Sequence, residues 1–186
     1  MQAIDALLGR RSARTLTEPA PDAGALELMF SAAARAPDHG RLRPWRFVVV
    51  AKDKRERLGE VLARSLQRRE PDASSESLRR EREKAMRAPL IVVVAAQIRK
   101  GHKIPEVEQL ASTAAAAQNI MLAAHALGYG AMWKTGAPAY DDAVKRELGL
   151  TDDDEIIGFL YLGTAIGGTP AIPPPSSRDH IVTWTG

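Results

Sequence analysis

The sequence predicts a single domain of class α+β or α/β, in which a central sheet lies under helices. Three apolar runs, at 47–51 (FVVVA), 90–97 (LIVVVAAQ) and 155–164 (EIIGFLYLGT), are too continuous for half-exposed strands and indicate buried ones. Segments with the apolar spacing of helices separate these runs. The chain has 186 residues, of which 45% are hydrophobic, which is enough for one well-packed core but little for two.

The first predicted core helix begins at Asp22. In DAGALELMFSAAARAP, apolar residues recur at helical spacing behind an N-cap aspartate, and Pro37 ends the helix. A polar loop between Pro37 and Pro44 leads into the first buried strand. After that strand, residues 53–69 and 76–87 are predicted to form exposed helices joined by a linker.

The longest helical pattern extends from Pro105 to Leu127, with proline in its first turn and Gly128 where a C-cap glycine belongs. Its second half is apolar nearly all round, so we expect a second subunit to cover part of it. GAMWKT at 130–135 predicts a short strand, and YDDAVKRELGL at 140–150 predicts a helix.

Residues from about 164 to 186 are predicted to form an extended C-terminal arm. The prolines in this segment forbid helix and remove strand donors, yet it ends in the apolar stretch IVTW. We expect Ile181 to Trp184 to add to a sheet edge, with a partner subunit as the candidate host. A frayed terminus is the alternative.

Composition and charge argue against several classes of function. There is no cysteine, which rules out disulfides, thiolate metal sites and cysteine nucleophiles. Net charge is only +3, and the charged stretch 66–87 alternates acids with bases and lacks aromatic residues, so a nucleic-acid partner is not expected. The first residues do not resemble a secretory signal, and no run approaches the roughly 20 apolar residues of a membrane span. We therefore expect a cytoplasmic protein without membrane attachment.

Familiar catalytic and metal motifs are missing from the sequence. The four histidines show no i, i+4 pairing and no carboxylate-rich setting, so no metal site is expected. There is no GxSxG, no P-loop and no dinucleotide fingerprint after a strand. If the protein is an enzyme, its reactive group should come from a cofactor, and no side chain is assigned as catalytic.

A cluster of positive charge lies near the N-terminus, in RRSAR at 10–14. On a helix, Arg10 and Arg14 share a face at i, i+4, and Arg11 and the Ser12 hydroxyl add donors nearby. Such a cluster suits a phosphate dianion, which accepts charge-assisted hydrogen bonds. An exposed basic helix end is the alternative that spacing alone leaves open.

Four motifs in this order resemble the flavin-dependent nitroreductase family, particularly its small single-domain members. They are RRSAR at 10–14, RAPDHGRLRPWRF at 35–47, GAMWKTG at 130–136 and EIIGFLYLGT at 155–164. The resemblance implies an α+β sandwich with a central mixed sheet, in a homodimer that binds FMN at the subunit interface. It also implies that NADH or NADPH reduces the flavin and that a small-molecule acceptor, such as a nitroaromatic compound or a quinone, reoxidises it.

The resemblance assigns the basic cluster to the cofactor. Arg10, Arg11 and Ser12 match the family's R-R-S motif and would hold the FMN phosphate and ribityl chain. Arg14 also fits the pattern, either as a further ligand or as an ion-pair brace for the motif.

Two further groups of residues match flavin-contacting positions. Arg35 and His39 match positions that contact the flavin bound mainly by the other subunit, although a loop histidine that caps a backbone group is the alternative for His39. Trp133, Lys134 and Thr135 match a strand end beside the flavin, where backbone groups and Lys134 would support negative charge on the reduced ring. Taken alone, Trp133 is more typical of a core.

The sequence departs from the family in the loop after Pro37. Many members follow A-P-S-S with an asparagine that helps to hold the flavin pyrimidine, whereas this chain has Asp38, His39 and then Arg41. We expect a cationic Arg41 or His39 near the pyrimidine oxygens to stabilise the reduced flavin and raise its potential. The stretch 66–87 also diverges, so its part in the substrate mouth is left open.

Two rivals to an oxidoreductase remain at this point. One is a relative that consumes the flavin itself and turns over no external acceptor. The other is a non-enzymatic basic dimer that binds an acidic partner through RRSAR.

Overall fold

The computed structural model describes residues 2–167 and 176–186. A five-stranded sheet forms the centre of the fold. The three apolar runs supply its longest strands, β2 (Trp45–Ala51), β3 (Leu90–Ala96) and β5 (Glu155–Ala165). The short strands are β1 (Leu16–Thr17) and β4 (Gly130–Lys134). The strands predicted from the apolar runs and from GAMWKT are therefore confirmed.

Strand β5 is shared by most of the pairings in the sheet. It pairs with β3 on one edge, with β4 on the other and with β1 near its end, and β2 lies beyond β3. Every pairing between named strands is antiparallel. Among the described residues, the single parallel pairing is an isolated bridge between Ser12 and Ala131.

The α+β class is confirmed, but the sheet expected to be mixed is almost wholly antiparallel. Continuous apolar strands are typical of parallel sheets because helices cover both faces of such sheets. Here an antiparallel sheet is covered in the same way. β3 is buried at every residue, with Val92 and Val94 in one core and Ile91 and Val93 in the other. The apolar run therefore indicates burial on both faces and carries no information on strand direction.

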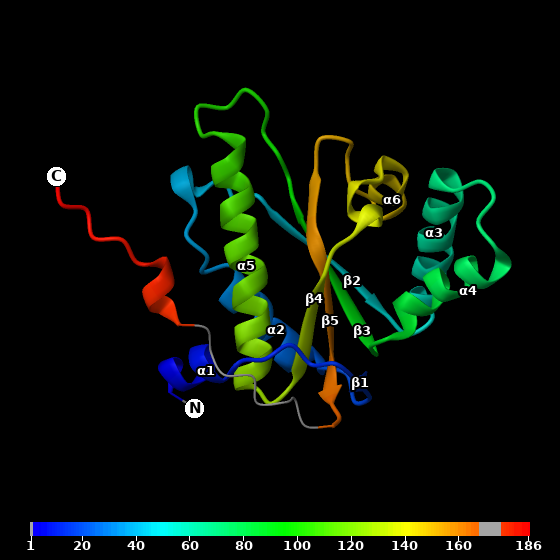
Figure 1. Ribbon diagram of the computed structural model, residues 1–186, viewed down its shortest axis with the longest axis horizontal. Coiled ribbons are helices and arrows are strands. Elements are labelled where there is room, and N and C mark those ends of the chain that lie inside the picture. Colours follow the sequence, from blue (N-terminus) through cyan, green and yellow to red (C-terminus); the bar gives the residue numbers. More distant parts are fainter. Residues whose placement is uncertain (1, 168–175) are drawn as a thin grey trace.

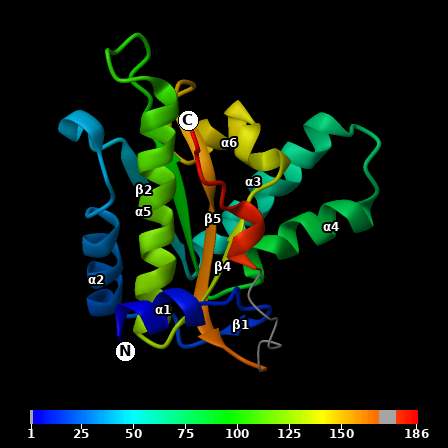
Figure 2. The same ribbon diagram turned by 60° about the vertical axis from the view of Figure 1, so that its left-hand side comes forward.

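Helices cover the two faces of the sheet as separate layers (Figure 1; Figure 2). On one face, α2 (Ala23–Ala33) and α5 (Glu106–Ala126) pack against each other and the sheet. On the other face lie α3 (Lys54–Arg69) and α6 (Asp142–Glu147), with α4 (Ser75–Glu83) packed on α3. In the part of the chain that the structure describes, none of these helices has the length and apolarity needed to cross a membrane.

The helices on the first face follow their sequence signals. The Asp22 carboxylate accepts a hydrogen bond from the Ala25 amide at 2.8 Å and caps α2. Gly128, just beyond α5, has a φ of +87°, a left-handed conformation that glycine adopts without strain. The most buried residues of α5 pack in the core that it shares with α2 and the sheet. Much of the cover expected for α5 is thus supplied by the same chain.

The first of the two helices predicted to be exposed has one buried face. α3 buries Leu58, Leu62 and Leu66 under its charged surface, so the prediction of an exposed helix is wrong for this face. These leucines recur at i, i+4 and i+8, a stripe that the dense charges around it concealed. The second helix ends at Glu83 and continues as a 3-10 turn over Lys84–Met86.

The basic segment near the N-terminus is not helical. Helix α1 (Ala3–Gly9) ends before it. The chain then follows the edge of β4, where the Ala13 amide donates to the Ala131 carbonyl at 2.9 Å. The prediction that Arg10 and Arg14 share a helix face is therefore wrong. Pairing with β4 also buries Ala13, which is 5% exposed, and a continued helix would not have made this contact.

The C-terminal residues extend away from the rest of the described chain (Figure 1). A 3-10 turn, Ser177–His180, is followed by exposed residues in which Val182 and Trp184 are 91% and 89% exposed. Residues 168–175 of the predicted arm lie outside the described residues. The addition of Ile181 to Trp184 to a sheet edge stays a prediction.

Gly130 is the point at which the N-terminal segment crosses the start of β4. A Cβ there would lie 2.6 Å from Leu16 Cδ2, 2.8 Å from Ala165 Cβ and 3.0 Å from Ala13 Cβ. Because this space is already filled, Gly130→Ala is expected to lower the free energy of unfolding by about 1–3 kcal/mol. Urea unfolding, followed by circular dichroism, measures the change.

The matched control is Gly24→Ala in α2. A Cβ at Gly24 has an ordinary contact of 3.5 Å with the Asp22 side chain, so the substitution should be neutral or stabilise by up to about 1 kcal/mol. Equal stability of the two variants would contradict the close packing at Gly130.

Candidate functional site

Arg10 ends helix α1 and presents an unused hydrogen-bond donor. Its amide donates to the Ala6 carbonyl at 3.0 Å. Its Nη1 atom is buried and has no hydrogen-bond partner among the described residues. A buried donor without an acceptor costs roughly 1–3 kcal/mol, and more when it is charged. The position therefore favours an anion that accepts from Arg10.

The neighbours of Arg10 in the basic cluster have other surroundings. Arg11 folds back, with Nη1 donating to the Leu8 carbonyl at 2.7 Å and to the Arg10 carbonyl at 3.0 Å, and so satisfies the end of α1. Ser12 is exposed beside Ala131 at the edge of β4. Arg14 is exposed as well. Of the three arginines, Arg10 is the one with a buried donor that has no acceptor among the described residues.

Trp133 is held in the sheet by its side chain. The indole Nε1 donates to the Ile157 carbonyl at 3.2 Å, and the ring lies over Gly158, where a Cβ would come within 2.2 Å of Nε1. The half-buried ring packs against the core on the α2 and α5 face. The alternative of a core tryptophan thus describes the buried part of the side chain, and the contact of Trp133 with a ligand stays a prediction.

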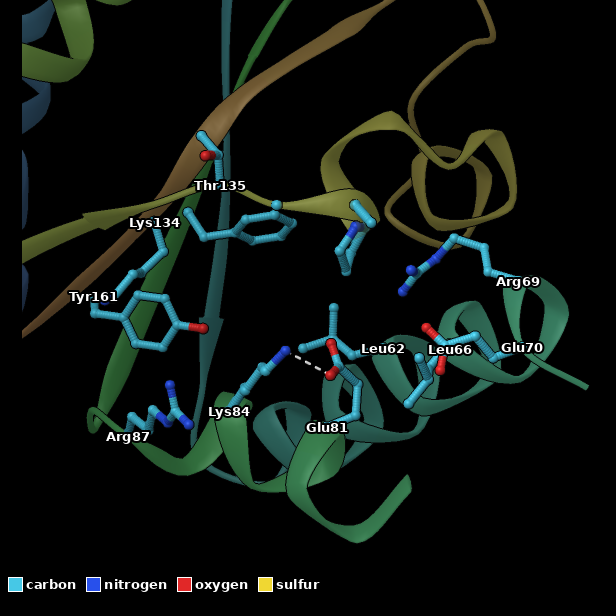
Figure 3. A pocket seen from close by; sticks show the side chains of 14 residues that line it. Leu62, Leu66, Arg69, Glu70, Glu81, Lys84, Arg87, Lys134, Thr135 and Tyr161 are labelled. Carbon is cyan, nitrogen blue, oxygen red and sulfur yellow. Dashed lines mark hydrogen bonds and ion pairs between the residues drawn. The ribbon is translucent and has the colours of Figure 1, made fainter. Parts of the chain in front are cut away.

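A cavity of about 460 Å³ opens where β4 ends, between the sheet and helices α3 and α4 (Figure 3). Lys134 and Thr135 line it, and Leu62, Leu66 and Phe159 form apolar walls. This volume is within the usual range for small-molecule sites. The charged residues that line the cavity are Arg69, Glu70, Glu81, Lys84, Arg87 and Lys134.

The charges of the cavity are unevenly balanced. Glu81 is only 6% exposed, and its carboxylate accepts a hydrogen bond from Lys84 Nζ at 2.5 Å. Arg87 and Lys134 form no ion pair within the described residues. Arg69 and Glu70 also line the cavity and take part in none of these ion pairs, so the four cations and two carboxylates of the lining leave an excess of two positive charges. The described chain holds no group of three or more histidine, aspartate or glutamate side chains suited to a metal ion.

Tyr161 supplies a neutral donor to the same cavity. Burial raises the pKa of its phenol above the ordinary value, Arg87 opposes the rise, and the charge of Glu81 adds to it. Figure 3 shows the hydroxyl directed into the cavity. The phenol is therefore protonated at physiological pH and is able to donate a hydrogen bond.

Sequence reasoning missed the α4 side of the cavity because it took the charged stretch 66–87 for a solvated surface. A signal was nevertheless present. Glu81 lies three residues after Leu78 and four before Ala85, which places it on the apolar side of an otherwise charged helix.

The segment 35–41 does not line the cavity of its own chain. Arg35, His39 and Arg41 are exposed and are not among the residues that line the cavity. Among the described residues, the His39 side chain makes no hydrogen bond to a backbone group, and its Nδ1 lies 2.6 Å from Glu108 Oε2. The Asp38 carboxylate caps the loop instead, by accepting from the Leu42 and Arg43 amides at 3.2 and 2.8 Å. The capping alternative for His39 is therefore wrong.

The anion position and the cavity lie along one sheet edge. Ser12 is paired with Ala131, and Lys134 is three residues further along the same strand. At roughly 3.3 Å per residue, Ala131 and Lys134 are about 10 Å apart along β4. A ligand that spans both parts needs an anionic group near Arg10 and a second group in the cavity, joined by a chain of about this length.

Known proteins are similar to this chain in sequence and in fold. The model of the nitroreductase family matches residues 7–164. A protein of Escherichia coli (strain K12) named "Putative NAD(P)H nitroreductase YdjA" is 38% identical over 164 residues, which cover 88% of each chain.

Two solved structures have the same fold. A nitroreductase-like family protein from Bacillus cereus superimposes with a TM-score of 0.86 at 24% identity, over 100% of this chain and 97% of the other. The FMN- and NADPH-dependent nitroreductase NfnB from Sphigopyxis sp. strain HMH has a TM-score of 0.78 at 22% identity, over 100% of both chains.

Proposed function

The chain belongs to the nitroreductase family, and from this premise we propose that it is an FMN-dependent oxidoreductase. NADH or NADPH would supply the electrons, and nitroaromatic compounds, quinones or similar small molecules would accept them. The name of the Escherichia coli relative and the FMN and NADPH dependence of NfnB support this proposal.

The observation that carries the proposal is the unused donor of Arg10. A buried guanidinium nitrogen without a partner is suited to a phosphate oxygen, and the Ser12 hydroxyl lies on the adjacent sheet edge. These two residues would bind the FMN phosphate, with Arg11 holding the end of α1 in place beside them.

The cavity fits the flavin ring at the other end of the ligand. Leu62, Leu66 and Phe159 offer apolar surfaces to a planar ring, and Lys134 and Thr135 lie at the mouth beside the edge of β4. The ribityl chain would follow β4 between Ala131 and Lys134, a stretch of about 10 Å by strand geometry.

When bound, FMN supplies the redox chemistry, because it accepts a hydride from the nicotinamide and passes electrons to the acceptor. The protein contributes position and electrostatics. Arg87 and Lys134 provide uncompensated positive charge in the cavity, and the protonated Tyr161 donates a hydrogen bond from its wall. No side chain acts as a nucleophile, so the rate depends on holding donor and acceptor close to the flavin.

A second copy of the chain completes the proposed site. Arg35 and His39 lie outside the cavity of their own subunit, and we infer that they contact the flavin bound by the other. Apolar side chains available for such an interface include Leu8 of α1, 68% exposed, and Trp184 of the C-terminal arm, 89% exposed.

Steady-state turnover tests the proposed activity directly. The holoenzyme is expected to oxidise NADH or NADPH for many cycles per bound FMN when a quinone such as menadione is present. Loss of the flavin without dependence on the quinone would point instead to the flavin-consuming rival. A protein that ignores FMN would favour the basic dimer with an acidic partner.

Arg10→Ala tests the phosphate site. The substitution is expected to raise the dissociation constant for FMN about 10- to 100-fold, because a hydrogen bond to a charged group is worth roughly 1.5–3 kcal/mol. Binding of riboflavin, which lacks the phosphate, should change little. Fluorescence titration of the apoprotein measures both constants.

The control for this test is Arg79→Ala on the outer surface of α4, where Arg79 pairs with Glu76. Its affinity for both flavins should match the wild type. If Arg10→Ala weakens riboflavin as much as FMN, Arg10 does not hold the phosphate.

Sedimentation equilibrium tests the dimer. We expect a mass of two 20.2 kDa chains, and Trp184→Ala should raise the dimer dissociation constant at least about tenfold, since a tryptophan buries roughly 200 Å². Tyr140→Ala, which removes an aromatic side chain that is 73% exposed elsewhere on the surface, is the control. A monomeric wild type would contradict the shared site.

A further inference from the structure

Glu81 is a buried carboxylate to which the proposed function assigns no role. It is 6% exposed and lines the cavity from α4 (Figure 3). The other glutamates of this helix, Glu76 and Glu83, are exposed and pair with Arg79 at the surface. Buried carboxylates are rare unless they are paired, and the partner of Glu81 is Lys84, at 2.5 Å.

Glu81 changes the charge that the cavity offers to a ligand. It neutralises Lys84, whereas Arg69, Arg87 and Lys134 remain without ion-pair partners in the described chain. Its field also reaches the opposite wall, since its charge contributes to the raised pKa of Tyr161. The cavity is therefore less positive than its cations alone would make it.

We propose that Glu81 weakens the binding of reduced FMN relative to oxidised FMN and so holds the reduction potential of the bound flavin down. This inference rests on the proposed function, because it requires the flavin ring to occupy the cavity. A hydride carries two electrons and one proton, so its transfer from the nicotinamide oxidises the nicotinamide and gives a neutral flavin one negative charge. Glu81 repels that charge, and its pairing with Lys84 removes a cation that would attract it.

The consequence for turnover is a division of driving force between the two half-reactions. A lower reduction potential of the bound flavin makes hydride transfer from the nicotinamide less favourable. It makes electron transfer from the reduced flavin to the acceptor more favourable. Glu81 thereby favours the reduction of acceptors that are themselves difficult to reduce.

Glu81→Gln tests the proposal on the FMN-loaded protein. Glutamine has nearly the same size and still accepts a hydrogen bond from Lys84, so the substitution removes mainly the charge. The ratio of the oxidised to the reduced FMN dissociation constants should rise at least about tenfold, which raises the midpoint potential of this two-electron couple by about 30 mV. Equilibration with a reference dye of known potential measures it. Lys84→Gln should shift the potential in the opposite direction.

Glu83→Gln is the matched control, because it removes the same charge from the same helix outside the cavity. The ratio of its oxidised to reduced FMN dissociation constants should stay within about twofold of the wild-type ratio, since an exposed charge is screened by solvent. Its midpoint potential should therefore change little. An equal shift in Glu81→Gln and Glu83→Gln would assign the effect to net charge and overturn the role of the buried carboxylate.

A second readout needs no flavin. In the apoprotein, Glu81→Gln should lower the pKa of Tyr161, which faces Arg87, Lys84 and Lys134 as its other charged neighbours. Ultraviolet titration detects phenol ionisation, and Tyr161→Phe identifies its contribution. An unchanged Tyr161 titration would show that the carboxylate does not act across the cavity.

The outcomes separate the two proposals. A wild type that binds no FMN removes the proposed function and the inference together. Normal FMN binding with an unchanged or lowered potential in Glu81→Gln overturns the inference alone. If Glu81→Gln does not fold, Lys84→Gln decides the matter, because a potential that fails to fall in that variant contradicts the charge balance.

Discussion

The antiparallel pairing of β4 with β5 is the interaction on which the rest of the site depends. Its register sets Lys134 opposite Phe159 and Met132 opposite Tyr161, so side chains of both strands meet at one cavity. The outer edge of β4 receives Ser12 through its bridge to Ala131, which fixes Arg10 at the same edge. The small residue Gly130 at the start of β4 permits this crossing, because its Cβ position is already filled by neighbours.

Burial leaves a local pattern in a sequence, and for this reason much of the fold could be predicted. The apolar runs gave the long strands, and Asp22 marked the start of α2 through its own hydrogen bond. Strand direction could not be predicted, because strands covered on both faces look alike whether they are parallel or antiparallel. The conformation of RRSAR was also mistaken, since it is decided by the contact of Ala13 with Ala131, a residue distant in the sequence.

The candidate site was predicted in part for similar reasons. Motif matches selected Lys134 and Thr135, which do line the cavity, and Arg10, whose buried donor is unused within the described chain. The role of Glu81 was not predicted. A buried ion pair and a row of acids and bases on an exposed helix face have the same sequence pattern. What distinguishes Glu81 is its burial on the cavity side of α4, which depends on how α4 packs on α3. The roles of Arg35 and His39 depend on a second subunit and stay predictions.

Positive charge is common to both parts of this site. Arg10 has an unused cationic donor where a phosphate would bind, and the buried carboxylate of Glu81 reduces the positive charge of the cavity.

The most direct test of flavin binding is the visible absorption spectrum of the purified protein, recorded before and after denaturation and after FMN is added to any apoprotein. A yellow protein that releases about one FMN per subunit is the predicted result. A colourless protein whose spectrum and stability are indifferent to added FMN would contradict it.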